Sequence, residues 1–136
     1  MTADGELFRN EDLTLRLEHG GRVVRVTRSA TPFPSPQEAE QSYEPVFASL
    51  DRLGRGGRCL LYDQRQVVGR NDAAFESAFA RIRNRVVPGF RKAGTLVASK
   101  VGLLHLRRLI REDGLERLAS DSESEILEYF FDVQGS

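Results

Sequence analysis

The chain has 136 residues, enough for one domain with a buried core. Twenty Lys and Arg balance twenty Asp and Glu, so the zero formal net charge provides no overall field that would attract nucleic acid or an acidic membrane. Cys59 is alone, which excludes an internal disulfide, and no apolar run approaches the roughly 20 residues that span a bilayer. The polar residues 1–5 lack a signal-peptide core, and we expect a cytoplasmic protein.

The first third of the chain alternates apolar and polar residues and then becomes helical in pattern. Residues 13–28 predict a β-hairpin, because apolar residues recur at every second position on both sides of a turn at residues 19–21. Residues 7–8 are a candidate for a short strand before it. Ser35 then caps a helix that has proline in its first turn and an acid three residues after the cap. Pro45 interrupts the apolar stripe of this helix and predicts a kink or two helical pieces.

The chain is organised around residues 58–87. The run from Cys59 to Tyr62 is apolar without alternation, which is typical of a strand covered on both faces. Cys59 is therefore interpreted as a small core residue and not as a nucleophile. A helix begins at Asn71 or Asp72. Its inward face carries residues spaced three and four apart: Phe75, Ala78, Phe79, Ile82 and Val86.

Two more strands and two more helices are predicted in the remainder. Residues 93–98 form a short buried strand, and the serine that follows caps a helix over residues 100–113. Residues 115–119 form the last strand, after which Ser120 and Glu123 make a capping box for a final helix. The inward residues of these two helices are expected to be Val101, Leu103, Leu106, Ile110, Ile126, Leu127, Phe130 and Phe131.

The order of these elements is hairpin, helix, strand, helix, strand, helix, strand, helix. Strands that alternate with helices predict an α/β fold with a mostly parallel sheet and right-handed crossovers. The N-terminal hairpin makes the sheet mixed, and about four helices cover it. We predict a single domain over residues 1–136, with a core of about residues 7–132.

At residues 13–131 this order resembles the STAS domain superfamily, in particular its SpoIIAA-like branch. The run Leu60 to Asp63 is similar to the family's central strand, which ends in Asp. Residues 90–97 are similar to the segment that leads into the third crossover, and residues 120–130 to the closing helix behind an acid-rich cap. The resemblance implies a STAS-like fold and a binding module, not an enzyme, as in antagonists of anti-sigma factors.

Some STAS domains are switched by phosphorylation of a Ser or Thr at the start of the helix after the central strand. That place falls near Asn71-Asp72-Ala73, where there is no hydroxyl, and Ser77 lies about one turn inside the helix. We therefore expect a module without a Ser/Thr phospho-switch. Some relatives are linked to lipid-like ligands through similarity with Sec14-type domains. The alternative function is thus a small-ligand or lipid-like carrier, with an apolar pocket beneath the Phe75/Phe79 helix.

Functional groups in a parallel sheet gather outside the carboxyl ends of the strands. The binding residues predicted on this ground are Asp63, Arg65, Arg70, Asn71, Asp72, Ser99 and Lys100. A simpler interpretation makes Asn71 or Asp72, Ser99 and Ser120 helix caps only, each worth about 1 kcal/mol. Likewise, Asp63 and Arg65 would form a surface ion pair of little worth.

Charge is unevenly distributed along the second half. Residues 81–111 contain nine basic residues and no acid, whereas residues 112–132 contain eight acids and one base. The split could steer an acidic partner or a phosphate-bearing ligand. We favour ordinary solvated faces with some pairing between the two stretches.

Groups that could perform catalysis are few. His19 and His105 have no Cys or Ser partner at motif spacing, and no spacing of ligands indicates a metal site. The glycines at residues 54–57 precede a strand, which is the wrong context for a phosphate loop. We therefore expect no enzyme, no cofactor and no metal. The predicted function is a regulatory, signalling protein-interaction module that binds another protein and not nucleic acid, with a homo-oligomer left open. Its surface would be residues 67–72, the helix behind them and the start of the Lys100 helix.

Overall fold

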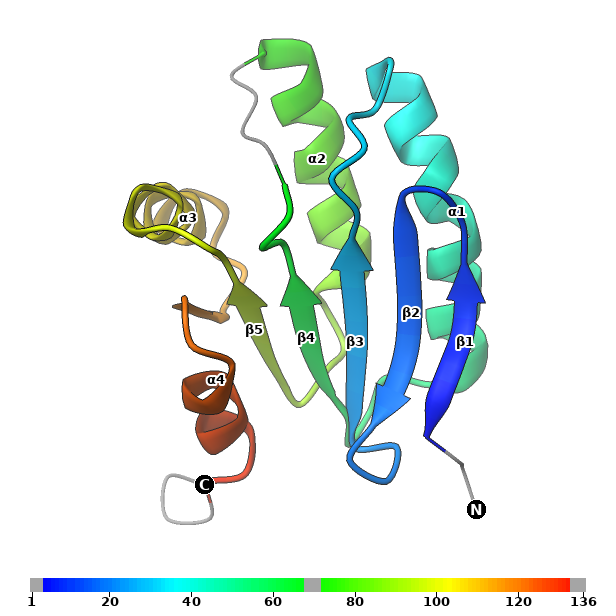
Figure 1. The fold of residues 1–136 in the computed structure, drawn as a ribbon, viewed down its shortest axis with the longest axis vertical. Coiled ribbons are helices and arrows are strands. Elements are labelled where there is room, and N and C mark those ends of the chain that lie inside the picture. The colour runs from blue at the N-terminus through cyan, green and yellow to red at the C-terminus, as the bar shows by residue number, and fades with distance from the viewer. Residues whose placement is uncertain (1–3, 68–71, 133–136) are drawn as a thin grey trace.

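The computed structural model describes residues 4–67 and 72–132 (Figure 1). Six strands and four helices follow one another in these two ranges. Their bounds are β1 (Gly5–Arg9), β2 (Leu13–Glu18), β3 (Val23–Arg28), α1 (Pro36–Leu53), β4 (Cys59–Asp63), α2 (Ala73–Val86), β5 (Lys92–Leu96), α3 (Lys100–Asp113), β6 (Leu118–Ser120) and α4 (Glu123–Phe130).

The six strands form one sheet in chain order, β1-β2-β3-β4-β5-β6. The first three strands pair antiparallel, and β3 to β6 pair parallel. The predicted α/β fold with a mixed, mostly parallel sheet, an N-terminal hairpin and four helices is therefore confirmed. Residues 7–8 do lie in a strand, β1, which extends the hairpin to three strands.

Three of the helices lie on the same face of the sheet. Each parallel strand is the neighbour of the one before it, so right-handed crossovers carry α1, α2 and α3 to one side. The strand register agrees, because Tyr62 pairs with Thr95 and Thr95 with Ala119, which places these residues on one face. Tyr62 packs in the core beneath α1 and α2, and Ala119 packs against α3. In Figure 1, α1 and α2 run along the sheet, whereas α3 is seen almost along its axis.

The two faces of the sheet have separate cores. Alternate residues of β2, β3 and β4 pack with α1 and α2 in the larger core, which includes Leu15, Val26 and Leu60. On the opposite face a smaller core joins Leu61 to Phe130 of α4. Both faces of β4 are thus covered, as its unalternating apolar run predicts, and Cys59 is buried in the smaller core.

Helix α1 continues through Pro45 without the predicted break into two pieces. Its inner residues before and after the proline, among them Tyr43 and Leu50, enter the same core, and this packing outweighs one lost backbone hydrogen bond. The predicted N-cap at Ser35 is confirmed, since its Oγ accepts from the backbone N–H of Glu38 at 3.1 Å, and the Ser35 hydroxyl donates to the Glu38 carboxylate at 3.0 Å.

Two boundaries near the C-terminus differ from the prediction. The last strand, β6, is Leu118–Ser120 and not residues 115–119, because it pairs only with Gly94–Leu96 of β5. Ser122, not Ser120, caps α4 by accepting from Glu125 N–H at 3.3 Å. The hydroxyl of Ser120 accepts instead from Ser122 N–H at 3.0 Å and closes a turn between the strand and the helix.

The predicted inward position of Val101 is wrong, because 78% of this residue is exposed. At about 100° per residue, Val101 lies roughly 160° around the helix from Leu103, which packs inward together with Leu106. Phe79 is only half-buried and lies at the edge of the larger core, unlike the fully packed Ile82.

Gly94 of β5 is a place where the close contact between the sheet and α4 requires glycine. A Cβ at this position would lie 2.5 Å from Cγ2 of Ile126, a buried and stiff side chain. We expect Gly94→Ala to lower the free energy of unfolding by about 1–3 kcal/mol in chemical denaturation. Gly56→Ala, where a Cβ meets nothing within 4 Å, is the matched control and should change stability by less than about 1 kcal/mol. An unchanged stability in Gly94→Ala would contradict the close packing of α4.

Candidate functional site

Asp63 lies at the carboxyl end of β4, where the sequence predicts a binding residue, and it is buried with 5% of its surface exposed. Its carboxylate accepts from Nε and Nη2 of Arg65 at 3.0 and 2.8 Å. It also accepts from Nη1 of Arg25, on the neighbouring strand β3, at 3.2 Å. The predicted Asp63–Arg65 ion pair therefore forms, but on a buried carboxylate and with a second arginine.

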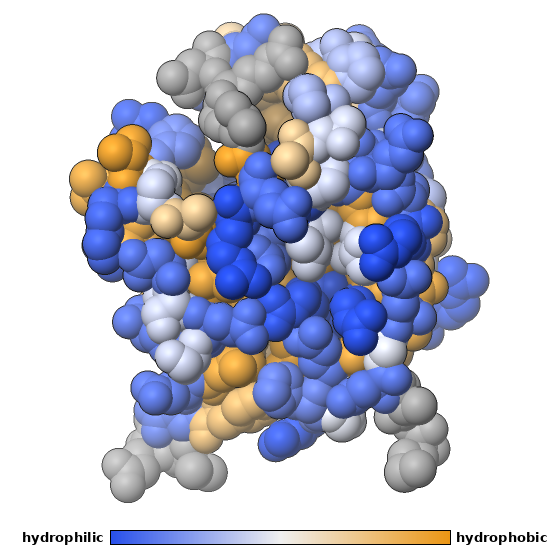
Figure 2. All heavy atoms as spheres, in the orientation of Figure 1, coloured by the Kyte–Doolittle hydropathy of each residue, from blue (hydrophilic) through white to orange (hydrophobic). Residues whose placement is uncertain are grey.

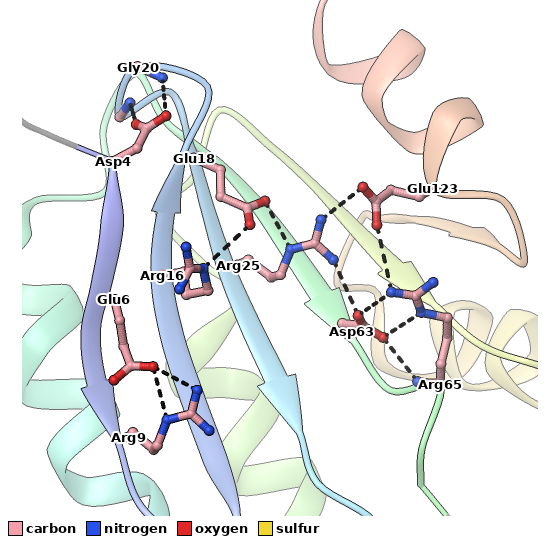
Figure 3. Close-up of polar contacts among 11 residues, drawn as sticks. Asp4, Glu6, Arg9, Arg16, Glu18, Gly20, Arg25, Asp63, Arg65 and Glu123 are labelled. Atoms are coloured by element: carbon pink, nitrogen blue, oxygen red, sulfur yellow. Dashed lines mark hydrogen bonds and ion pairs between the residues drawn. The ribbon is translucent and has the colours of Figure 1, made fainter.

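Arg25 is the centre of a larger charged network on this face of the sheet (Figure 3). Besides Asp63, its guanidinium lies 2.9 Å from Glu18 of β2 and 2.9 Å from Glu123 in the first turn of α4. Figure 3 shows these side chains pointing toward one another from separate elements, with Arg65 3.7 Å from Glu123 on the outer side. The network thus ties α4 to three segments of the sheet.

The network lowers the pKa of two of its carboxylates, Glu123 and Asp63. Hydrogen bonding to Arg25 lowers the pKa of Glu123 below its ordinary value of 4.5, although burial acts in the opposite direction. Burial would by itself raise the pKa of Asp63, but the hydrogen bonds from Arg65 outweigh it and the pKa is lowered. Because their charges pair with each other, Asp63 and Arg65 have a structural role in this network. A binding role for them stays a prediction.

Two of the predicted residues at the helix starts, Asp72 and Ser99, are caps. Asp72 accepts from Ala74 N–H at 2.9 Å, and Ser99 accepts from Gly102 N–H at 3.0 Å. Lys100 forms an ion pair at 2.8 Å with Asp121, which joins the chain after β5 to the chain after β6. Their part in binding is untested, and the predicted residues Arg70 and Asn71 lie outside the described residues.

Some side chains of the basic stretch, residues 81–111, form ion pairs with side chains of the acidic stretch, residues 112–132. Arg83 of the basic stretch contacts Asp113 at 3.3 Å, and Lys100 contacts Asp121 of the acidic stretch. Lys92 donates to the backbone carbonyl of Tyr129 at 2.7 Å near the end of α4. These pairs agree with the favoured interpretation of solvated faces with mutual pairing, while the arginines on the outer side of α3 remain exposed.

A cleft of about 520 Å³ lies between α2 and α3, on the face opposite the charged network. Its apolar lining includes Phe33, Phe75, Phe79 and Ile82, and the ring centres of Phe75 and Phe79 lie 6.1 Å apart. The polar lining includes Arg28, Tyr62, Gln64, Arg83, His105 and Glu112. The cleft is where the alternative function requires a pocket, beside the helix that carries Phe75 and Phe79.

Arg28 is the residue in this cleft that the sequence analysis missed. It lies at the end of β3 with only 8% of its surface exposed, and its guanidinium carbon is 4.7 Å from the ring centre of Phe33 and 5.1 Å from that of Phe79. The alternation of β3 could have indicated that Arg28 points inward, because Val24, Val26 and Arg28 share the face that packs against α1 and α2.

The hydroxyl groups of Tyr62 and Tyr43 form a buried hydrogen bond beneath the cleft. Burial raises the pKa of both phenols, and the positive charge of Arg28 acts in the opposite direction on each. Both phenols therefore stay protonated at neutral pH and offer hydrogen bonding without charge. Of the three polar side chains Tyr43, Tyr62 and Arg28, only Arg28 carries a charge.

A comparison with solved structures finds the same architecture in an uncharacterised protein of the DUF3478 family from Shewanella loihica PV-4, described as having a SpoIIAA-like fold. The match covers 94% of this chain and 92% of that one, with a TM-score of 0.56 and 12% sequence identity. The fold is SpoIIAA-like. No family model matches the chain, and no curated protein matches its sequence.

The match to a SpoIIAA-like structure agrees with the resemblance of residues 13–131 to that branch of the STAS superfamily. At 12% identity it concerns the fold and does not extend to activity or partners. Within residues 4–67 and 72–132, no helix combines the length and apolar character needed to cross a membrane. The same residues contain no cluster of three or more His, Cys, Asp or Glu suited to a metal ion.

The charged network predicts a clear difference between two arginines that contact the same glutamate. We expect Arg25→Met to lower the free energy of unfolding by about 3 kcal/mol, because it leaves Asp63 and Glu123 short of a partner. Arg16→Met, which removes a partly exposed and longer ion pair with Glu18 at 3.8 Å, should change stability by less than about 1 kcal/mol. Chemical denaturation measures both, and equal losses would contradict the central place of Arg25.

Proposed function

We propose that this SpoIIAA-like domain is a non-catalytic module that acts by binding another protein, in a regulatory role in the cytoplasm. The observation that carries the proposal is the outer side of α3. Val101 and Leu104 are 78% and 66% exposed there, and large apolar side chains exposed together favour an interaction site. Apolar atoms are visible at the surface over α3 at the left of Figure 2.

A basic group of side chains accompanies these two apolar residues. Arg107, Arg108 and Arg111 are all exposed, and helical geometry places them on the same side of α3 as Leu104. Such a surface fits a partner that presents apolar side chains within an acidic rim. The apolar contacts would provide affinity, and the arginines would increase the association rate.

The charges at the carboxyl end of β4 support a non-catalytic role. Asp63 and Arg65 bond to each other and Asp63 bonds to Arg25, so the carboxylate is not positioned to take a proton from a substrate. Asp72 supports a module without a phospho-switch. Its carboxylate occupies the N-cap of α2, the place at which switch-type relatives carry a hydroxyl.

A second candidate function is supported by the cleft between α2 and α3. Its volume of about 520 Å³ lies within the range of small-molecule sites, and most of its exposed lining is apolar. On this view the domain carries a small ligand and its outer α3 surface is secondary. The two functions use different residues of α3, because the cleft is lined by His105, Leu109 and Glu112 and the outer surface is formed around Val101 and Leu104.

The first function predicts the effect of charges placed on α3. With tagged protein as bait in a lysate of the source organism, Val101→Glu/Leu104→Glu should reduce recovery of a stoichiometric partner by more than tenfold, because it buries charge in an apolar contact. Leu7→Glu, on exposed Leu7 of β1, is the control and should recover the partner normally. Equal recovery by the two variants, both folded by circular dichroism, would exclude the α3 surface.

The fixed-state hypothesis predicts a separate result for Asp72. If its charge sets the binding state, Asp72→Ser should change partner affinity by more than about tenfold while stability changes by less than about 1 kcal/mol, because serine also caps helices. Titration calorimetry with the captured partner measures the affinity. Unchanged affinity would make Asp72 a cap only. A phosphate on Ser77 or Ser99 that controls binding, detected by mass spectrometry, would contradict the fixed state.

A further inference from the structure

The cleft between α2 and α3 contains a buried charge that lacks a counter-charge. Arg28 is 92% buried, and among the residues that the structure describes it forms no ion pair, while its Nε–H has no hydrogen-bond partner. Buried charges in proteins are almost always paired, because removing a guanidinium from water costs several kcal/mol. Something other than a protein carboxylate is therefore needed to explain an arginine here.

The surroundings of Arg28 fix its position and leave its charge available. The rings of Phe33 and Phe79 hold the guanidinium through cation–π contacts, which offset only part of the lost hydration. Arg83, the other arginine of the lining, is already compensated by Asp113 at 3.3 Å. The acids of the lining, Glu76 and Glu112, are exposed at the surface. An anion entering the cleft would thus meet Arg28 as its uncompensated positive charge.

The chemistry of the lining defines the ligand class. A guanidinium presents planar N–H donors that match the oxygens of a carboxylate, sulfonate or phosphate. Next to it, Phe75 and Phe79 form an apolar wall that suits an aromatic ring or a short alkyl chain. We propose that this cleft binds a small organic anion, with its acidic head on Arg28 and its apolar body between α2 and α3. This inference rests on the second of the two functions proposed above and names its ligand class.

The test compares an anionic and a neutral probe of the same cleft. Titration with 8-anilino-1-naphthalenesulfonate should show saturable fluorescence with one site per chain, and Arg28→Met should weaken binding at least tenfold. Arg52→Met, which removes an exposed arginine from the last turn of α1, should change the affinity less than twofold. Nile red, a neutral dye, should bind Arg28→Met and the unchanged protein with affinities within twofold of each other, because methionine preserves the apolar wall.

Three other results would contradict the anion site, and one of them would contradict the carrier function as well. Nile red binding together with equal sulfonate affinity in Arg28→Met and the unchanged protein would overturn the anion site and leave the carrier function standing. Failure of both dyes to bind the unchanged protein would overturn the anion site and the carrier function together. Equal weakening by Arg28→Met and Arg52→Met would show a general charge effect and would also overturn the assignment.

A second pair of variants tests the location without touching Arg28. Ala80 lines the cleft and is half-buried, so Ala80→Phe should fill the space and reduce the binding of both dyes at least tenfold. Ala74→Phe, on the exposed side of α2, should bind both dyes normally. Full sulfonate binding by folded Ala80→Phe would place the probe elsewhere and would overturn the proposal even if Arg28→Met fails to fold.

Discussion

The constraint on which this structure depends is the order of its parallel strands. Because β3 to β6 are neighbours in chain order and their crossovers are right-handed, three helices must share one face of the sheet. Helix α3 lies at an angle to α2, and the cleft lies between them (Figure 1). The opposite face receives only α4, whose first turn is fixed by Arg25 and Glu123. Both candidate surfaces, the cleft and the outer side of α3, follow from this arrangement.

Two arginines of β3 show how one strand serves structure on one face and binding on the other. Arg25 and Arg28 are three residues apart and point to opposite faces. Arg25 contacts three carboxylates and locks α4 to the sheet. Arg28 is as deeply placed but contacts aromatic rings, with no ion pair in the described part of the chain. The same side chain is thus satisfied by the protein on one face and, by our inference, by a ligand on the other.

Much of the fold could be predicted from local patterns, and most of the site could not. The unalternating run Cys59–Tyr62 predicted a strand covered on both faces, and cap residues located the starts of α1, α2 and α3. The apolar character of Val101 led to its incorrect placement on the inward side of α3. Its exposure follows from its angular position on the helix, roughly 160° from the inward-facing Leu103. The convergence of Glu18, Asp63 and Glu123 on Arg25 depends on pairing between distant segments, which spacing along one segment does not reveal.

The central claim is that Arg28 is the anion-binding group of a cleft between α2 and α3. A crystal structure of the protein grown with 8-anilino-1-naphthalenesulfonate tests it most directly. The account predicts density for the sulfonate within hydrogen-bond distance of the Arg28 guanidinium, with the naphthalene ring against Phe75 and Phe79. Density for the probe at another surface, with none in the cleft, would contradict it. An Arg28 guanidinium bonded to a protein carboxylate would contradict it as well.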